Sequence, residues 1–300
     1  MATTKLVMKL VYILLILFTF TISPAISTAP EGCDSGAENP CIDKAKALPL
    51  KIVAIVAILT TSLIGVMAPL FSRHISCLRP DDHGFMIVKC FASGIILGTG
   101  FVHVLPDSFE MLSSECLNDD PWHKFPFAGF VAMLSGLATL AIDSITTSFV
   151  LELGILFHSV VIGLSLGATN DACTIKGLII ALCFHHLFEG IGLGGCILQA
   201  DFKNVKKFLM AFFFAGTTPC GIFLGIALSS IYRDNSPTAL ITTGLLNACS
   251  AGMLIYMALV DLLATEFMGS MLQGSIKFQI KCFAAALLGC AIMSVVAKWA

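Results

Sequence analysis

The chain has 300 residues, of which 57% are hydrophobic and 12% are charged, and its formal net charge is −2. Its mean hydropathy is +0.93, and it contains several apolar runs of about 20 residues, each long enough to cross a bilayer. This composition is not that of a water-soluble protein. It predicts an all-α, polytopic membrane protein whose surroundings are the lipid bilayer, and we expect no nucleic-acid partner.

The first 27 residues have the pattern of a cleavable secretory signal peptide. Lys5 and Lys9 precede the apolar run 10–22, and Ala25 and Ser27 supply small side chains at the two positions that determine cleavage. An extra transmembrane helix is the alternative, but a run of 13 residues is too short to span the hydrocarbon core.

A polar segment follows at 28–49, and we expect it to be exoplasmic. Cys33 and Cys41 flank much of this segment and are candidates for a disulfide, because the secretory route is oxidising. Cys116 and Cys173 fall in predicted external loops and are candidates for a second bridge. Most of the twelve cysteines lie inside apolar runs instead, where a thiol serves as a small packing group.

Residues 50–300 are predicted to form one transmembrane domain of eight spans. Every backbone group that faces lipid must be bonded within its own segment, so the spans are helices. We expect them at about 50–71, 85–106, 126–144, 152–170, 177–199, 208–231, 239–263 and 278–298.

The cationic residues in the loops predict that both ends of the mature chain are exoplasmic. Cytoplasmic loops are enriched in Lys and Arg. With the mature N-terminus outside, the cytoplasmic side holds Arg73, Arg79, Lys89, Lys203, Lys206, Lys207, Lys277 and Lys281. Past the first span, the opposite side holds only Lys124, Lys176, Arg233 and Lys298.

The third and fourth spans are separated by very few residues. A single helix over 127–170 would be about 65 Å long, roughly twice the hydrocarbon thickness. It would also move the basic segment 203–207 to the exoplasmic side, against the distribution of charge. We therefore expect two spans with a tight reversal near Thr146–Ser148.

A cluster of ionisable residues lies within the fourth and fifth spans. His185 and Glu189 are four residues apart and share a helix face, His186 borders the same side, and His158 lies at similar depth on the preceding span. Imidazole and carboxylate groups suit Zn²⁺ or Fe²⁺ rather than Ca²⁺ or Mg²⁺. The alternative is a set of buried polar residues bonded to backbone carbonyls and hydroxyls. Intramembrane ionisable groups are costly and usually functional, which favours the metal site.

His103 and Asp107 form a second pair at spacing four, at the outer end of the second span. They could collect cations from outside, helped by the acidic loop that follows. A solvated helix terminus beside an ordinary acidic loop is the alternative. The other acidic residues in or near spans are as consistent with structural pairs as with ligands: Asp143, Glu152, Asp261 and Glu266.

No enzyme motif accompanies these clusters. The sequence lacks a His-Glu-x-x-His pair, a Gly-x-Ser-x-Gly elbow and a phosphate-binding loop. We therefore predict a protein that is not an enzyme and that has no cofactor.

Four segments together resemble the signature of the ZIP (zinc- and iron-permease) metal transporters. They are 158–167 (HSVVIGLSLG), 185–195 (HHLFEGIGLGG), 100–107 (GFVHVLPD) and 217–221 (TTPCG). The resemblance covers nearly all of the mature chain. Within the family the chain is most similar to the plant iron-regulated root transporters, which import Fe²⁺ and also handle Zn²⁺.

The resemblance implies eight helices in an inverted 3+2+3 repeat that work by alternating access around a midplane site. It implies that His158, His185 and Glu189 are primary ligands. It further implies that Ser159 and His186 belong to a neighbouring second site. His103 and Asp107 would then be the external groups that receive the ion.

Two departures from the family pattern stand out. Ile162 and Thr218 occupy positions that are acidic in many relatives, so we expect one ion to be carried at a time. The long histidine-rich third cytoplasmic loop of relatives is missing near 146–151.

We therefore expect uptake of Fe²⁺, Zn²⁺ or both into the cytoplasm. The missing loop leaves open a metal-binding sensor or regulatory subunit that does not transport. We expect the plasma membrane, with a vesicular membrane as the alternative, and we leave open whether the chain forms a homodimer.

Overall fold

The computed structural model describes residues 44–72, 82–145, 150–199, 203–228 and 237–297, and its elements there are helices. In chain order they are α2 (Lys44–Ser72), α3 (His83–Gly98), η2 (Thr99–Val104), α4 (Leu105–Leu112), η3 (Asp119–His123), α5 (Phe127–Ile145), α6 (Val150–Ala168), α7 (Ala172–Gln199), α8 (Asn204–Leu228), α9 (Pro237–Tyr256), η4 (Met257–Ala264), α10 (Thr265–Phe267), α11 (Ser270–Gln273) and α12 (Ile276–Val296).

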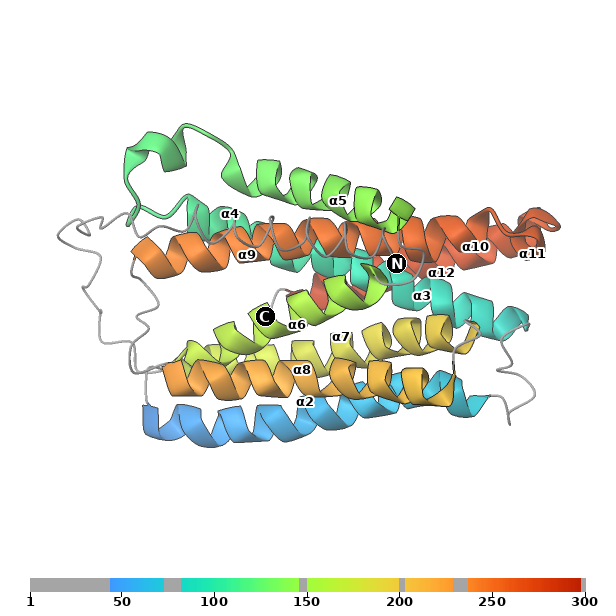
Figure 1. Ribbon diagram of the computed structural model, residues 1–300, viewed down its shortest axis with the longest axis horizontal. Helices are drawn as coiled ribbons and strands as arrows, with labels where there is room; N and C mark the ends of the chain where they lie inside the picture. The colour runs from blue at the N-terminus through green and yellow to red at the C-terminus, as the bar shows by residue number, and fades with distance from the viewer. Residues whose placement is uncertain (1–43, 73–81, 146–149, 200–202, 229–236, 298–300) are drawn as a thin grey trace.

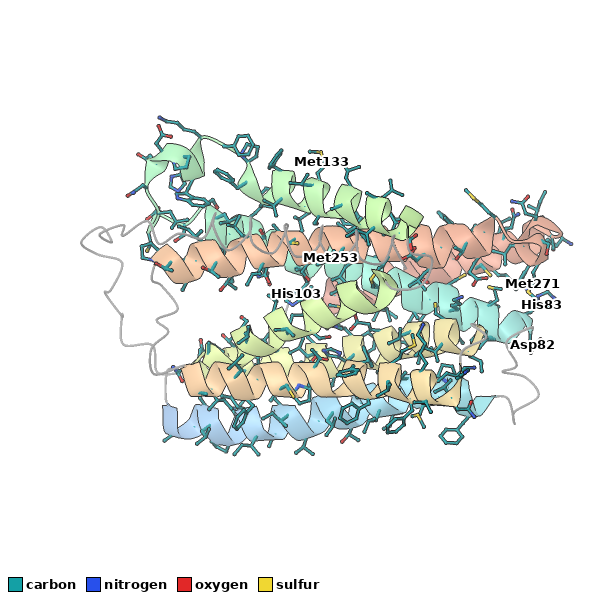
Figure 2. The ribbon with its side chains drawn as sticks, in the orientation of Figure 1. Asp82, His83, His103, Met133, Met253 and Met271 are labelled. Atoms are coloured by element: carbon teal, nitrogen blue, oxygen red, sulfur yellow. The ribbon has the colours of Figure 1, made fainter. Side chains whose placement is uncertain are left out.

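Six helical stretches in the described part of the chain are long and apolar enough to cross a membrane: 45–71, 83–112, 172–198, 204–227, 237–267 and 276–296. The apolar helices α5 and α6, each of 19 residues, lie on the other two predicted ranges. Large apolar side chains such as Phe208, Met133 and Phe223 are exposed, which suits contact with lipid. Figure 2 shows Met133 on the outer side of α5.

Several predictions concern residues that the structure does not describe. The signal peptide at 1–27, the pair Cys33 and Cys41, and the reversal near 146–148 all lie outside the described residues. In the described part of the chain, α2 already covers residues 44–49, so the last part of the expected 28–49 segment is helical. Cys116 and Cys173 are both disulfide-bonded, as an external position predicts; the choice of partner for each stays a prediction.

The helices form two halves that lie side by side along a common long axis (Figure 1). One half contains α2, α6, α7 and α8, and its strongest contacts join α2 to α7 and α6 to α8. The other half contains α3, α4, α5, α9 and α12, and its strongest contacts join α3 to α12 and α5 to α9. The two halves meet mainly where α3 faces α7 and where α6 faces α9.

Glycines allow the backbones to touch within each half. A Cβ added to a glycine at these crossings would lie 2.0–2.5 Å from a carbonyl oxygen of the neighbouring helix, a distance that no side chain tolerates. The four crossings are Gly65 on Leu187, Gly163 on Thr218, Gly94 on Ala286 and Gly252 on Ala132. Each half is therefore locked by backbone contact.

The contact between the halves is different, because side chains mediate it. Where α7 faces α3, a Cβ on Gly192 would meet Ile96 Cδ1 at 3.5 Å, and one on Gly195 would meet Phe85 Cζ at 3.2 Å. Side-chain ends can adjust, whereas backbone carbonyls cannot. The boundary between the halves is thus the more adaptable surface.

The second and seventh predicted spans each contain a π-helical stretch, η2 and η4. In the first of these, Pro106 follows directly and lacks an N–H, and its ring would clash with the carbonyl of Val102 in a regular α-helix. The wider turn relieves this clash. It also carries His103, and π-helical turns are frequent at functional sites.

We predict that Gly94→Ala destabilises the protein by about 1–3 kcal/mol, because the new Cβ would collide with the backbone of α12. The melting temperature of the purified full-length protein in detergent measures this. Gly216→Ala is the control, since a Cβ there meets nothing within 4 Å. Equal melting temperatures for the two variants would contradict this account of the helix crossings.

Candidate metal site

Two helices from the same half supply three potential metal ligands. His185 and Glu189 project from one face of α7 because they are a single helical turn apart. His158 comes from α6, which crosses in front of α7 (Figure 1). One ligand atom from each of these three residues lies within 4.8 Å of the other two.

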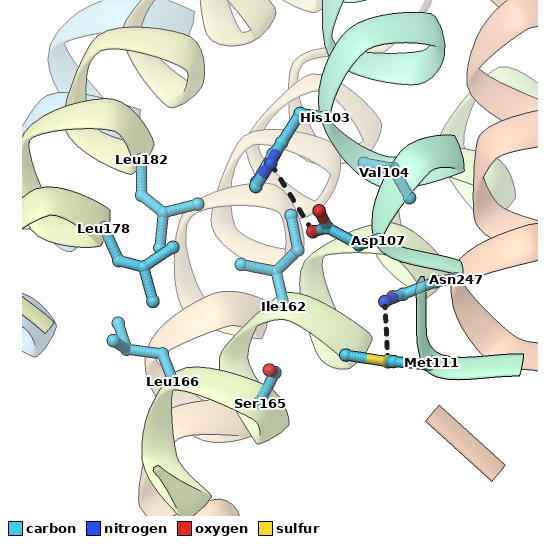
Figure 3. A pocket seen from close by; sticks show the side chains of 10 residues that line it. All are labelled: His103, Val104, Asp107, Met111, Ile162, Ser165, Leu166, Leu178, Leu182 and Asn247. Atoms are coloured by element: carbon cyan, nitrogen blue, oxygen red, sulfur yellow. Dashed lines mark hydrogen bonds and ion pairs between the residues drawn. The ribbon is translucent and has the colours of Figure 1, made fainter. Parts of the chain in front are cut away.

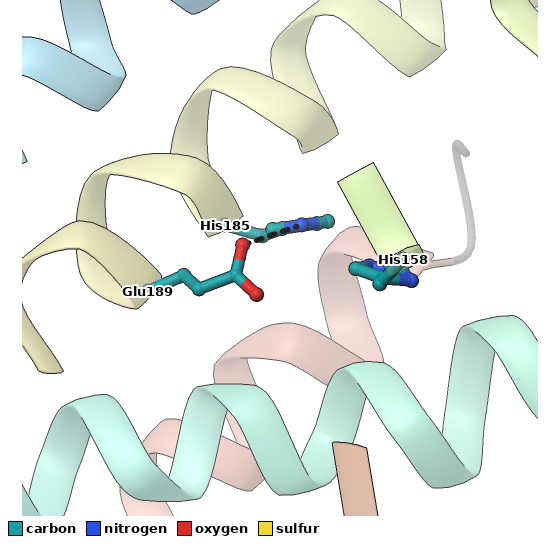
Figure 4. Close-up of side chains that lie close together, drawn as sticks. All are labelled: His158, His185 and Glu189. Atoms are coloured by element: carbon teal, nitrogen blue, oxygen red, sulfur yellow. Dashed lines mark ion pairs between the residues drawn. The ribbon is translucent and has the colours of Figure 1, made fainter. Parts of the chain in front are cut away.

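The three side chains are buried and turned toward one another (Figure 4). The rings of His158 and His185 stack with centroids 5.4 Å apart and planes inclined by 23°. Nε2 of His185 lies 3.5 Å from Oε2 of Glu189. Ligands of a tetrahedral zinc ion would be about 3.3 Å apart, so His185 and Glu189 are already close to that spacing, whereas the group as a whole, spread over up to 4.8 Å, would have to contract around an ion.

Among the described residues, several polar atoms of this cluster have no hydrogen-bond partner. They include Nε2 of His158, both ring nitrogens of His185 and Oε2 of Glu189. Buried polar atoms are almost always bonded, and leaving them unpaired is costly. Convergent, unpartnered nitrogen and oxygen donors are what a transition-metal cation requires.

His186 lies next to this group but faces a different helix. Its ring stacks on that of His185, 4.6 Å between centroids, and its Nε2 lies 3.2 Å from Thr218 Oγ1 on α8. Its Nδ1 is 3.5 Å from Oε2 of Glu189, so the carboxylate links both imidazoles. Ser159 is fully buried, and its Oγ has no partner among the described residues. A second site at His186 and Ser159 stays a prediction.

The predicted external pair lies at a small cavity. Nδ1 of His103 is 3.5 Å from Oδ2 of Asp107, and the carboxylate is the more exposed of the two. Both residues line a cavity of about 50 Å³ (Figure 3). Figure 2 shows His103 between the two halves of the bundle. The sequence did not single out two other residues at this cavity, Asn247 and Met111, whose Nδ2 and Sδ are 3.8 Å apart.

Apolar side chains form part of the lining of this cavity. They are Ile162 and Leu166 from α6 and Leu178 and Leu182 from α7. Ile162 is one turn from His158, and each of His158, His185 and Glu189 is at most 2% exposed. These three side chains are not among the residues that line the cavity.

Sequence reasoning missed one further contact of the ligands. Ser250, on α9 of the opposite half, lies with its Oγ 2.7 Å from Nδ1 of His158, and both residues are fully buried. Ser250 and Asn247 are three residues apart in an apolar span, which puts them on one helix face. That spacing of polar residues is the signal that could have identified both.

The remaining acidic residues of the spans serve mixed roles. Glu266 forms an ion pair with the buried Lys89, and Asp143 accepts a hydrogen bond of 3.1 Å from Tyr256 Oη. These are structural pairs, one of the two interpretations that the sequence allowed. Asp261 has one buried carboxylate oxygen without a partner in the described structure.

The long apolar helices define a membrane protein, and His158, His185 and Glu189 form a buried group that could hold a metal ion. Comparison with known proteins identifies its family. A family model described as "ZIP Zinc transporter" matches residues 48–150 and 146–297. The chain therefore belongs to the ZIP family of metal transporters.

Individual relatives are similar over their full length. Fe(2+) transport protein 2 of Arabidopsis thaliana is 76% identical over 354 aligned positions, which cover 100% of both chains. Fe(2+) transport protein 1 of the same plant is 63% identical, with 100% of this chain and 99% of the relative covered. Zinc transporter 7, also from Arabidopsis thaliana, is 45% identical with 100% of both covered.

We predict that His185→Ala weakens Co²⁺ binding to the purified protein by at least about 100-fold, more than the 10- to 100-fold typical of losing an outer-shell partner. His186→Ala should cost less than about 10-fold, because this ring is turned toward Thr218. The visible absorption of bound Co²⁺ reports both affinities. Equal losses of Co²⁺ affinity in the two variants would contradict the different roles that we assign to His185 and His186.

Proposed function

We propose that this protein imports Fe²⁺, Zn²⁺ or both into the cytoplasm through a site formed by His158, His185 and Glu189. Membership of the ZIP family makes it a transporter of divalent metals rather than an enzyme. The observation that carries the assignment of the site is the convergence of three buried side chains, several of whose nitrogen and oxygen atoms have no hydrogen-bond partner among the described residues. Fe²⁺ and Zn²⁺ both accept this set of nitrogen and oxygen donors.

We further propose eight membrane spans in an inverted 3+2+3 repeat. The pattern of helix contacts supports this, because the strongest contacts are kept when the first three spans are exchanged with the last three and the fourth with the fifth. The pair α2–α7 then corresponds to α8–α6, and the pair α3–α12 corresponds to α9–α5. The π-helical stretches η2 and η4 also occupy equivalent spans.

Transport proceeds by alternating access in this proposal. An external ion is first held at His103 and Asp107, and then passes the apolar side chains to the buried ligands. The half that carries the ligands moves as a unit, since glycine contacts lock it internally, while the adaptable boundary with the other half permits the shift. One ion is carried at a time, because neutral Ile162 and Thr218 add no carboxylate to the site.

A metal sensor or regulatory subunit is the second candidate, and the short junction between α5 and α6 favours it. The two matched parts of the family model meet at residues 146–150. The alignment with Fe(2+) transport protein 2 contains more positions than the 300 residues of this chain, so that relative has residues without a counterpart here. Purified protein in liposomes separates the candidates, because a sensor binds metal without moving it.

We predict that His158→Ala and Glu189→Ala each abolish uptake of iron and zinc by metal-starved cells, because the ion loses a direct ligand. Uptake is measured by elemental analysis, and surface biotinylation confirms that the protein reaches the plasma membrane. His123→Ala is the control, since this imidazole lies at the outer η3 turn and bonds Asp119 at 3.1 Å. Normal uptake by both ligand variants would refute the proposed site. If the wild-type protein is found only on internal vesicles, the vesicular membrane replaces the plasma membrane as the proposed location.

We also predict that Asp107→Asn raises the metal concentration for half-maximal uptake about two- to tenfold, because a charge that attracts cations at the cavity is lost. The maximal rate should change less than this concentration. The matched control is Asp120→Asn in the external segment, whose carboxylate is exposed and already paired with Lys124 at 2.7 Å. If uptake by Asp107→Asn and by wild type depends on metal concentration in the same way, Asp107 does not help to bind the incoming metal ion.

A further inference from the structure

The hydrogen bond between His158 and Ser250 joins the two halves of the molecule at the metal site. His158 belongs to α6 in the half that carries the ligands, and Ser250 belongs to α9 in the opposite half. The Nδ1–Oγ distance is 2.7 Å, and both side chains are 0% exposed. It is therefore a short, water-free contact across the adaptable boundary.

Ser250 differs from three other buried hydroxyls of the described helices. Ser93, Thr99 and Thr139 each donate to the carbonyl four residues earlier in their own helix, the usual arrangement for Ser and Thr in an apolar helix. The hydroxyl of Ser250 instead meets the imidazole of a metal ligand. Helix packing alone does not require a serine hydroxyl to bond an imidazole, because the carbonyl four residues earlier is available as an acceptor.

The bond decides which nitrogen of His158 is free for metal. Nδ1 is occupied by Ser250, whereas Nε2 is buried without a partner and belongs to the ring that stacks on His185. A neutral imidazole that donates its Nδ1–H to an oxygen presents the Nε2 lone pair to a cation. Such outer partners fix the ring orientation of metal-binding histidines.

We propose that Ser250 is a positioning residue that accepts the Nδ1–H bond of His158 and so holds Nε2 toward the cation in this arrangement of the halves. The inference rests on the proposed function and adds to it. Because the acceptor is on the half that does not carry the ligands, a relative shift of the halves breaks the bond. His158 then loses its orientation, and the ion is held less tightly at the stage when it must leave.

The test compares Ser250→Ala with Ser250→Thr in the full-length protein. Ser250→Ala should weaken Zn²⁺ or Co²⁺ binding by about 10- to 100-fold and raise the half-maximal concentration for uptake by a similar factor. Its maximal rate, corrected for surface protein, should fall much less. Ser250→Thr keeps a hydroxyl at the same position and should restore most of the affinity.

Ser135→Ala is the matched control, because it removes another hydroxyl of low exposure that contacts α9, at the carbonyl of Cys249, away from the ligands. A purely structural role for Ser250 would lower the melting temperature and surface level while leaving the half-maximal concentration unchanged, and that result overturns the inference. Equal loss of affinity in Ser135→Ala and Ser250→Ala overturns it as well. Failure of the wild-type protein to move metal would instead refute the proposed function, so the two failures are distinct.

Discussion

The structure depends above all on the cost of burying a polar group where neither water nor another polar group can reach it. Most polar side chains inside this bundle meet that constraint with a partner in the protein. Lys51, for example, donates to the carbonyl of Gly167 at 2.7 Å, where the end of α6 is electronegative. Among the described residues, the imidazoles of His158 and His185 and the carboxylate of Glu189 keep unpartnered atoms instead, and they are not alone in this, since Ser62, Ser159, His186 and Asp261 do so too. What distinguishes these three is that one nitrogen or oxygen atom of each lies within 4.8 Å of the other two, which is why we propose that they share a cation.

Glycine determines how the rest of the molecule can move. Contact between backbones at Gly65, Gly163, Gly94 and Gly252 fixes the helix pairs within each half. Longer side chains fill the boundary between the halves, and it is there that the external cavity and the Ser250–His158 bond lie. Glycine therefore has different consequences in the two places: it gives rigidity where it meets a neighbouring backbone, whereas Gly192 and Gly195 at the boundary face side-chain ends that can adjust.

Much of this could be predicted from the sequence, and the limits are physical. Apolar run length located the helices, and the spacing of His185 and Glu189 placed them on one face, because both depend only on local geometry. Membership of the ZIP family, inferred from the motifs around His158 and His185, is confirmed. The sequence could not show that α9 brings Ser250 against His158, since that contact depends on how α6 and α9 cross. It also could not show whether Glu266 was a ligand or an ion-pair partner, because Lys89 is 177 positions away in the chain.

The mixed lining of the outer cavity has a consequence for the hydration of the cargo. Ile162, Leu166, Leu178 and Leu182 line it beside His103 and Asp107, and aliphatic side chains cannot replace the water molecules that a divalent ion carries. In the proposed transport cycle the ion therefore keeps much of its hydration shell in the cavity and exchanges it for imidazole and carboxylate only at the buried site.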